Sequence, residues 1–271
     1  MDTLSALIAH AEPKANLFFS GNLCGSSDSS NHPTGGVLHL VRSGELALYN
    51  QTNLVQVINE PTLIIYPKGK AHRMQSKTLT GCDIVCANLT FKDSPLYRAL
   101  PNTIMLPLSQ LTNLSHVITM LFDEAFKPRF AQSAVISNLL DLLLLLVIRH
   151  LVENKVCGAG LLAALSESKL AKAIEVIHQQ PDHPWTVEEL AKQVGMSRAR
   201  FAALFHHVIG QPPLSYVTES RLLLAQKLLL MGSPIKSVCL EVGYSGSVAF
   251  SRAFQRQFDI TPKNWLKQAQ N

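Results

Sequence analysis

Apolar residues recur every three or four positions through the C-terminal half of the chain, a spacing that predicts amphipathic helices. Within residues 233–262, Ser233 supplies an N-cap oxygen, Pro234 suits the first helical position, and Gly243 follows the last apolar position. These signals predict a short helix, followed by a glycine-containing turn and a second helix. The positions expected to be buried are Ile235, Val238, Cys239 and Val242 in the first helix, and Phe250, Ala253, Phe254 and Phe258 in the second. Two short helices joined in this way form a helix-turn-helix.

The same pattern occurs in residues 186–210, which indicates an internal duplication. Thr186 and Glu189 have the spacing of a capping box, and Ser197 can cap the second helix of this copy. Between the copies, residues 214–231 are expected to form one longer helix that fixes the separation of the two units. The apolar positions match those of the later copy at a constant offset, with a one-residue slip in the turn: Val187, Leu190, Ala191, Val194 and Gly195, then Leu204, Phe205 and Ile209.

The last hundred residues resemble the AraC/XylS family of bacterial transcription regulators. The most specific match is GYSGSVAFSRAFQRQFDITP at residues 243–262, and Pro213, Tyr216 and residues 221–225 match the linker helix of that family. The resemblance implies an all-α domain in which two helix-turn-helix units enter successive major-groove segments of promoter DNA. The positions that it places toward the DNA are Arg198, Ala199, Arg200, Ala202, Ala203 and His206 in the first unit, and Ser247, Val248, Ser251, Arg252 and Arg256 in the second.

These positions differ in the contacts that their side chains allow. Arg252 is expected to contact a guanine, while Arg198, Arg200 and Arg256 are expected to hold phosphates. Alanine contacts thymine methyl groups but donates no hydrogen bond, so the first unit is expected to position the protein more than it specifies the sequence. The chain carries a net charge of +5, and from residue 166 onward twelve Lys and Arg accompany eight Asp and Glu. A basic surface attracts phosphate, so DNA binding should weaken as salt rises.

The first 110 residues are predicted to be mainly β-structure. Short runs rich in β-forming residues are separated by Gly, Pro, Asn or Ser turns, which is typical of a sandwich or small barrel. The predicted strands are residues 37–49, 54–58, 63–66 and 83–91. Residues 67–72, PKGKAH, resemble the second motif of cupin barrels, so a cupin-like β-barrel is implied. Metal-binding cupins need further ligands, but the earlier region offers only His39 and Glu45, so we expect no metal and interpret His72 as a pocket or structural residue.

Residues 110–126 and 133–154 are predicted to be helices that follow the barrel. Apolar positions cover much more than one stripe of the second helix, and one face of a barrel cannot bury them all. The helix either lies between the barrel and its neighbour helix within one subunit or forms a dimer interface; the resemblance to AraC-like proteins with a cupin domain favours a homodimer. The expected organisation is a cupin-like domain at 1–155, a linker at 156–167 and a DNA-binding domain at 168–271.

The remaining sequence features limit the classes of function. The N-terminus has no basic segment before its short apolar run, and the apolar run at residues 139–148 is shorter than a membrane span, so we expect a cytoplasmic protein without a membrane partner. Cupin barrels also serve as enzymes, but the metal set is incomplete and no nucleophile, zinc-protease or phosphate-loop motif is present. We therefore expect no enzymatic activity and no cofactor, but a transcription activator that acts on RNA polymerase.

The signal is expected to reach the protein through its cysteines. A cytoplasmic chain keeps its five cysteines reduced, and Cys82 and Cys86 would lie about 13 Å apart on one strand face, too far for a disulfide. Cys24 lies in the small, polar stretch 21–27, which should be exposed and mobile, and it could meet Cys86 across the barrel. The pattern is similar to that of AraC-type regulators that respond to oxidants such as reactive chlorine. Cys24 and Cys86 are thus the expected redox-sensing residues, with Cys82 and His72 as accessories. The alternatives are a small-molecule effector inside the barrel, or cysteines that are ordinary core residues.

Overall fold

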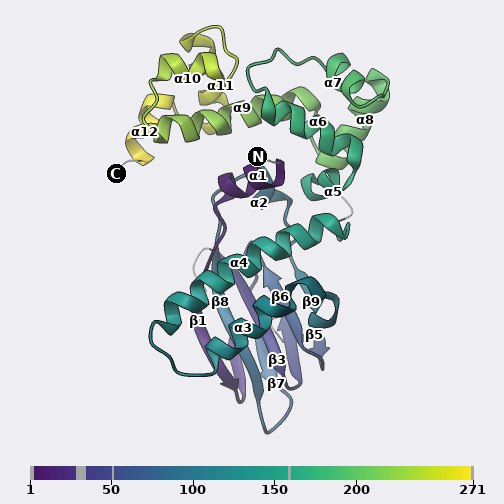
Figure 1. Cartoon of the computed structure of the whole chain (residues 1–271), viewed down its shortest axis with the longest axis vertical. Coiled ribbons are helices and arrows are strands. Elements are labelled where there is room, and N and C mark those ends of the chain that lie inside the picture. The colour runs from purple at the N-terminus through teal and green to yellow at the C-terminus, as the bar shows by residue number, and fades with distance from the viewer. Residues whose placement is uncertain (1–2, 29–34, 51, 158–159, 270–271) are drawn as a thin grey trace. The chain divides into compact units, whose positions relative to one another are not determined.

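The computed structural model describes residues 3–28, 35–50, 52–157 and 160–269 (Figure 1). The chain forms two compact units, one of Ala11–Leu151 and the other of Met1–His10 with Val152–Asn271. The first unit is mainly β and the second is helical, which confirms the expected fold class.

The β unit contains two antiparallel sheets. The five-stranded sheet has the order β1-β8-β3-β6-β9, and the four-stranded sheet has the order β2-β7-β4-β5. Each sheet combines early and late strands of the chain, as in a cupin-like barrel. The strands are β1 (Lys14–Leu23), β2 (Ser26–Asp28), β3 (Gly36–Ser43), β4 (Leu46–Asn50), β5 (Asn53–Ile58), β6 (Thr62–Tyr66), β7 (Arg73–Ser76), β8 (Cys82–Thr90) and β9 (Ile104–Pro107).

The core between the sheets follows from the alternation of side chains along each strand. Ile84 and Cys86 of β8 point to the same side because they are two residues apart, and both are buried. Val41, Ile64 and Tyr66 join them from the same sheet. The facing sheet contributes Leu46, Leu48, Ile58 and Met74.

Helices cover the other face of the five-stranded sheet, which explains why β3 is buried on both faces. Arg42 of β3 lies over the ring of Phe122 on α3 (Ser115–Ala125), with its guanidinium carbon 5.7 Å from the ring centre. Asp141 of α4 (Gln132–Glu153) accepts a hydrogen bond of 2.7 Å from the backbone amide of Ala15 on β1. Figure 1 shows both helices across the strands.

The helix α4 matches the prediction for residues 133–154. By length and composition alone it could cross a membrane, a property that core helices of globular proteins share. Its buried side chains are Ile136, Leu139, Leu140, Leu143, Leu144, Val147, Ile148 and Leu151. Packing within the subunit therefore accounts for most of its apolar surface, while Val135 and Leu142 stay exposed.

Several elements carry no clear signal in the sequence. The strand β1 was not predicted because most of its ten residues are exposed or half-buried and show no alternation. Two 3-10 turns, η1 (Leu108–Gln110) and η2 (Thr112–Leu114), occupy the start of the helix predicted at residue 110. The short strands β2, β7 and β9 and the helices α1 (Thr3–Ala11) and α2 (Pro95–Ala99) were not predicted either.

A helix also forms inside the expected linker. The segment α5 (Leu161–Ser166) begins after Gly160, whose φ of 84° suits glycine, and it buries Leu161, Leu162 and Ala164. The glycines near residue 160 suggested a linker, but the apolar residues that follow belong to the core of the helical unit.

The rest of the helical unit contains the predicted duplication. It consists of α6 (Ser168–Gln179), α7 (Val187–Gln193), α8 (Arg198–Ile209), α9 (Pro213–Leu230), α10 (Ile235–Glu241), α11 (Ser247–Phe258) and α12 (Pro262–Ala269). The linker helix is α9, as predicted. The prediction for α10 was wrong by one residue: Pro234 is its N-cap, and the amides of Ser237 and Val238 bond to the Pro234 carbonyl.

Candidate DNA-binding surface and cysteine pocket

The two helix-turn-helix units end their first helices in the same way. In the first unit, the amide of Gly195 bonds to the carbonyl of Lys192 and the amide of Met196 bonds to that of Ala191. In the second, Gly243 bonds to Leu240 and Tyr244 to Cys239. This pair of bonds defines a Schellman motif, which requires positive φ at the glycine. Gly195 and Gly243 have φ of 63° and 79°, so the duplication holds at the level of hydrogen bonds.

The second helices of the two units share a buried aromatic pair. Phe201 and Phe205 of α8 are fully buried with ring centres 5.5 Å apart, and Phe250 and Phe254 of α11 are fully buried at 5.7 Å. Each pair is four residues apart, so its two members lie on one face of the helix. The opposite face of each helix is thereby left for solvent.

The predicted DNA-contacting residues lie on those outward faces. In α8, Arg198, Ala199, Arg200, Ala203 and His206 are exposed and Ala202 is half-buried. In α11, Ser247, Val248, Arg252 and Arg256 are exposed and Ser251 is half-buried. The second turn is one residue longer than the first, so that Gly246 takes the N-cap position of α11, where Ser197 caps α8. The arrangement allows each helix to present arginine side chains to a nucleic-acid backbone or to base edges.

A capping box fixes the start of the first unit. The Thr186 hydroxyl accepts from the Glu189 amide at 3.1 Å, and the Glu189 carboxylate accepts from the Thr186 amide at 3.0 Å. The Thr186 hydroxyl also donates a hydrogen bond of 2.9 Å to the Glu189 carboxylate, and this bond above all, together with that from the Thr186 amide, lowers the pKa of Glu189. The predicted capping box is confirmed.

The two helix-turn-helix units are also joined through contacts with the linker helix α9. Arg221 of α9 donates hydrogen bonds of 2.7 Å to the carbonyl oxygens of Pro181 and His183, in the loop that leads to the first unit. The turn of the second unit packs on the same loop, because a Cβ placed on Gly243 would lie 2.9 Å from the backbone of Asp182 and 3.0 Å from the Arg221 guanidinium. The spacing between α8 and α11 is therefore held by direct packing as well as by α9.

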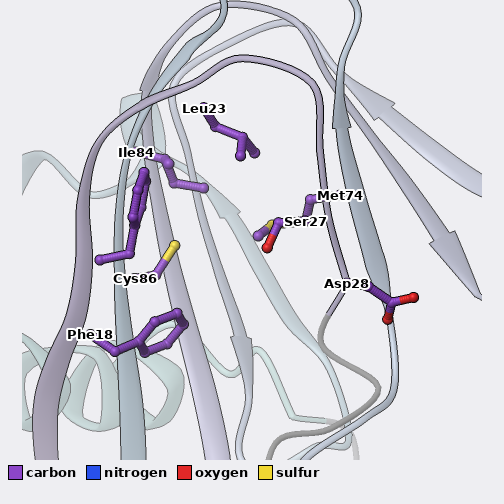
Figure 2. A pocket seen from close by; sticks show the side chains of 8 residues that line it. Phe18, Leu23, Ser27, Asp28, Met74, Ile84 and Cys86 are labelled. Carbon is purple, nitrogen blue, oxygen red and sulfur yellow. The ribbon is translucent and has the colours of Figure 1, made fainter.

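A pocket opens between the two sheets of the β unit, with a volume of about 340 Å³ (Figure 2). Five of the eight residues that line it are apolar, Ser27 and Asp28 give it a polar side, and we call it the cysteine pocket because Cys86 lines it. Figure 2 shows the sulfur of Cys86 projecting into the space between the labelled side chains. The apolar walls are Phe18, Phe19, Leu23, Met74 and Ile84.

A β-bulge shapes one wall of this pocket. The pairing of β1 with β8 shifts between Leu17 and Phe19, so that Leu17 faces Ala87 and Phe19 faces Cys86. In a regular strand, Phe18 and Phe19 would point to opposite sides of the sheet. The extra residue lets both rings line the pocket.

On its other side, Cys86 belongs to a chain of buried hydrogen bonds. His39 and Cys86 are direct partners in the pairing of β3 with β8, and His39 Nδ1 lies 3.1 Å from Cys86 Sγ. His39 Nε2 lies 2.8 Å from Nε2 of His72, and His72 Nδ1 lies 2.7 Å from the carbonyl oxygen of Lys70. Both histidines are buried, and neither is among the residues that line the cysteine pocket.

The direction of these hydrogen bonds follows from the last acceptor. The Lys70 carbonyl can only accept, so Nδ1 of a neutral His72 carries the proton and its Nε2 has the lone pair. His39 then donates from Nε2 and accepts at Nδ1 from the Cys86 thiol. Burial raises the pKa of Cys86 to about 12, so the thiol keeps its proton in the resting state.

The other cysteines occupy different surroundings. Cys24 is exposed, follows the end of β1, and lies 2.9 Å from Asn22 Oδ1. Its neighbour on β8 is Cys82, because Leu23 pairs with Cys82 whereas Phe19 pairs with Cys86. The stretch 21–27 is therefore built into two strand ends, and the structure brings Cys24 close to Cys82 and not to Cys86.

Cys82 is buried and donates to the Glu45 carbonyl at 3.1 Å, and burial raises its pKa. Cys239 is buried in the core of the second helix-turn-helix unit, and Cys157 is half-buried. Within the parts of the chain that the structure describes, no group of three or more His, Cys, Asp or Glu is arranged to hold a metal ion. The nitrogens of His39 and His72 that face each other are joined by a hydrogen bond, so they do not converge on a common ligand site.

Sequence reasoning missed His39 as the hydrogen-bond partner of Cys86. The sequence suggested His39 only as one member of an incomplete metal set. The signal that could have found it is the alternation in β3 and β8, which places His39 and Cys86 on inward faces, but the register between the strands is not readable locally.

Comparisons with known proteins identify both halves of the chain. The family model described as "Cupin" matches residues 2–153, and the model described as "Helix-turn-helix domain" matches residues 190–268. The HTH-type transcriptional regulator AlkR of Acinetobacter baylyi is 34% identical over 181 residues, which are 65% of this chain and 59% of AlkR. The RCS-specific HTH-type transcriptional activator RclR of Escherichia coli is 28% identical over 273 residues, which are 97% of this chain and 96% of RclR.

Among solved structures, ToxT from Vibrio cholerae matches with a TM-score of 0.40 and 15% identity, covering 94% of this chain and 96% of ToxT. The curated relatives are named as transcription regulators and not as enzymes. We conclude that the chain belongs to the AraC family of DNA-binding transcription regulators, in the group whose members carry a cupin domain before the helix-turn-helix units.

Proposed function

We propose that this protein is a cytoplasmic transcription activator that senses oxidants or electrophiles through Cys24 and Cys86. It binds promoter DNA as a homodimer, with α8 and α11 in successive major-groove segments, and acts on RNA polymerase. The basic side chains on the outward faces of these helices support the DNA contact. Val135 and Leu142, two large apolar side chains exposed on α4, support the dimer.

The observation that carries the sensing proposal is the contact of Cys86, which lines the cysteine pocket, with the buried His39. A buried thiol that only filled space would not need a hydrogen-bonded base and an open cavity. The likeness to RclR, whose name describes an RCS-specific activator, supports the same class of signal.

Oxidation at these positions would change the β unit at Cys86 in the pocket or at Cys24 after the end of β1. A sulfenate on Cys86 would add a polar oxygen to an apolar pocket, and one on Cys24 would alter the connection between β1 and β2. A bond between Cys24 and Cys86 requires the segment after Leu23 to shift along β8, because that segment lies beside Cys82. Either event alters the strands that wall the pocket, and such a change can bias the protein toward one DNA-binding state.

The second candidate is regulation by a small molecule that binds in the cysteine pocket without reacting. The volume of about 340 Å³ and the apolar walls favour it. In that case the response would survive replacement of Cys86 by serine, which keeps the size of the side chain.

Reporter expression and footprinting with and without hypochlorite test the proposal in wild type, Cys24→Ser, Cys82→Ser and Cys86→Ser. We expect the oxidant response to be lost in Cys86→Ser and reduced in Cys24→Ser, with DNA binding intact in reduced protein. An unchanged response in both variants would refute sensing through these cysteines. A loss restricted to Cys82→Ser would move the reactive position to the pair that the structure places side by side.

A further inference from the structure

We infer that Cys86 is a nucleophile for uncharged, apolar organic electrophiles that bind in the cysteine pocket, and that His39 accepts its proton during the attack. The inference rests on the proposed sensing function and goes further, because it names the class of molecule and the base. Activated carbon–carbon double bonds, as in quinones and unsaturated ketones, are the chemistry that this site fits.

The pocket sets the class of molecule. A volume of about 340 Å³ falls within the roughly 300–1,000 Å³ of small-molecule sites, and an oxidant of two or three atoms would leave most of it empty. Two phenyl rings, Phe18 and Phe19, form one wall, and they suit a flat apolar molecule. An anionic molecule would lose its hydration among the apolar side chains and would meet the carboxylate of Asp28.

The environment of Cys86 makes a base necessary. Burial raises the pKa of the thiol to about 12, so only about one thiol in 10⁵ is ionised at neutral pH. His39 Nδ1, at 3.1 Å from the sulfur, is within reach to take the proton as the sulfur attacks. The positive charge that appears on His39 is stabilised by His72 Nε2, which accepts from His39 at 2.8 Å and is itself fixed by the Lys70 carbonyl.

The step is a conjugate addition and needs no oxidant. The S–H bond of Cys86 breaks and its proton moves to His39 Nδ1. The sulfur electron pair forms a bond to the β-carbon of the double bond, whose π electrons move toward the carbonyl to give an enolate. His39 then returns the proton to the α-carbon, so that the products are a neutral thioether and a neutral imidazole.

Two maleimides of different charge test the inference on the full-length reduced protein, and normalisation to Cys24 removes the difference in their intrinsic reactivity. N-phenylmaleimide is uncharged and apolar, while N-(2-carboxyethyl)maleimide is an anion. Modification of each cysteine is followed over time by peptide mass spectrometry, and exposed Cys24 serves as the internal reference. Relative to Cys24, we expect Cys86 to react at least tenfold faster with the uncharged probe than with the anion.

Two variants test the role of the base and the role of the pocket separately. His39→Gln should slow the reaction of Cys86 with N-phenylmaleimide at least tenfold while leaving the preference for the uncharged probe, since the pocket is intact. Leu23→Trp should fill the pocket from its half-buried rim and reduce that preference, while the contact of Cys86 with His39 remains. His116→Gln, at an exposed histidine of α3, is the matched control and should change neither quantity.

Equal rates for the two probes at Cys86, or a rate in His39→Gln equal to wild type with Cys24 unchanged, would overturn the inference. If His39→Gln misfolds, the buried Cys82 and Cys239 will be labelled faster than in wild type. The Leu23→Trp variant then tests the inference in its place. Because the labelling needs no DNA, it remains informative if the regulator shows no oxidant response in footprinting, which would remove the proposed function alone.

Discussion

Arg221 of the linker helix α9 is hydrogen-bonded to His183, in the loop before the first helix-turn-helix unit: its guanidinium donates a hydrogen bond of 2.7 Å to the carbonyl oxygen of His183. A second bond of 2.7 Å reaches Pro181, and the same guanidinium contacts the turn at Gly243. One side chain thus joins the loop before the first helix-turn-helix unit, the linker helix and the turn of the second unit.

Replacing Arg221 should therefore uncouple the two units. Arg221→Ala leaves two backbone carbonyls without their charged donor, and we expect a loss of about 3 kcal/mol in the free energy of unfolding. DNA affinity should fall more for a site that spans both major-groove segments than for a half-site. Fluorescence anisotropy on the two DNA lengths measures this, and equal losses on both would contradict a role in spacing the units.

The two Schellman glycines give a matched pair for the same contact. Gly195 and Gly243 both have positive φ, but a Cβ meets nothing within 4 Å at Gly195 and meets the Asp182 backbone at 2.9 Å at Gly243. Gly195→Ala should cost about 1–2 kcal/mol from the backbone alone. Gly243→Ala should cost clearly more, and chemical denaturation of the two variants measures the difference. Equal losses in the free energy of unfolding would show that the loop at Asp182 moves aside without an energetic cost.

Arginines on α11 should divide into sequence-reading and phosphate-binding classes. Arg252→Ala is expected to cost about 1–3 kcal/mol on the preferred DNA site and to relax the preference at one base pair. Arg256→Ala, one helical turn later on the same exposed face, should weaken specific and random DNA alike and reduce the salt dependence of binding. Selection of bound DNA fragments followed by affinity measurements separates the two; an equal loss on specific and random DNA for Arg252→Ala would make it a phosphate contact.

Stability of the helical unit should decline in mild acid because of His178. Burial above all, together with the charge of His10, lowers the pKa of His178 from 6.5 to about 4. The unfolded chain therefore binds a proton between about pH 6.5 and pH 4 that the folded chain does not bind, so the free energy of unfolding falls as the pH falls through this window. A shift of this size corresponds to about 3 kcal/mol.

Thermal unfolding between pH 7 and pH 4 measures this dependence. His178→Gln keeps a polar group near the Tyr216 hydroxyl, which lies 3.0 Å from His178 Nε2, and should flatten the pH dependence. His207→Gln, at an exposed histidine, is the control and should leave it unchanged. A slope in His178→Gln as steep as that of wild type would assign the acid sensitivity to other groups.

Local signals were sufficient for the two helix-turn-helix units and insufficient for the pocket. The capping box at Thr186 and the helix ends at Gly195 and Gly243 depend on residues within one or two helical turns, so they can be predicted directly from the sequence. The contact of His39 with Cys86 joins residues 47 positions apart and depends on which strands pair and in which register. No periodicity within either strand carries that information.

The expectation that Cys24 lies in a mobile stretch near Cys86 shows the same limit. The polar, glycine-containing sequence suggested a loop, but pairing with β8 extends β1 through Leu23 and places Cys24 beside Cys82. The β-bulge between Leu17 and Phe19 lets two adjacent rings line the same pocket. It likewise cannot be predicted until the partner strand is known.

Asp141 gives α4 a defined rotation about its own axis. A helix with leucines on most of its surface could pack against a flat apolar sheet at many angles with similar burial, since dispersion contacts have little directional preference. The carboxylate accepts from Lys14 Nζ and from the Ala15 amide, both at 2.7 Å, and only one rotation of the helix satisfies both donors. A single acidic residue thus fixes the rotation of the helix, and it decides which apolar side chains, Val135 and Leu142, stay exposed.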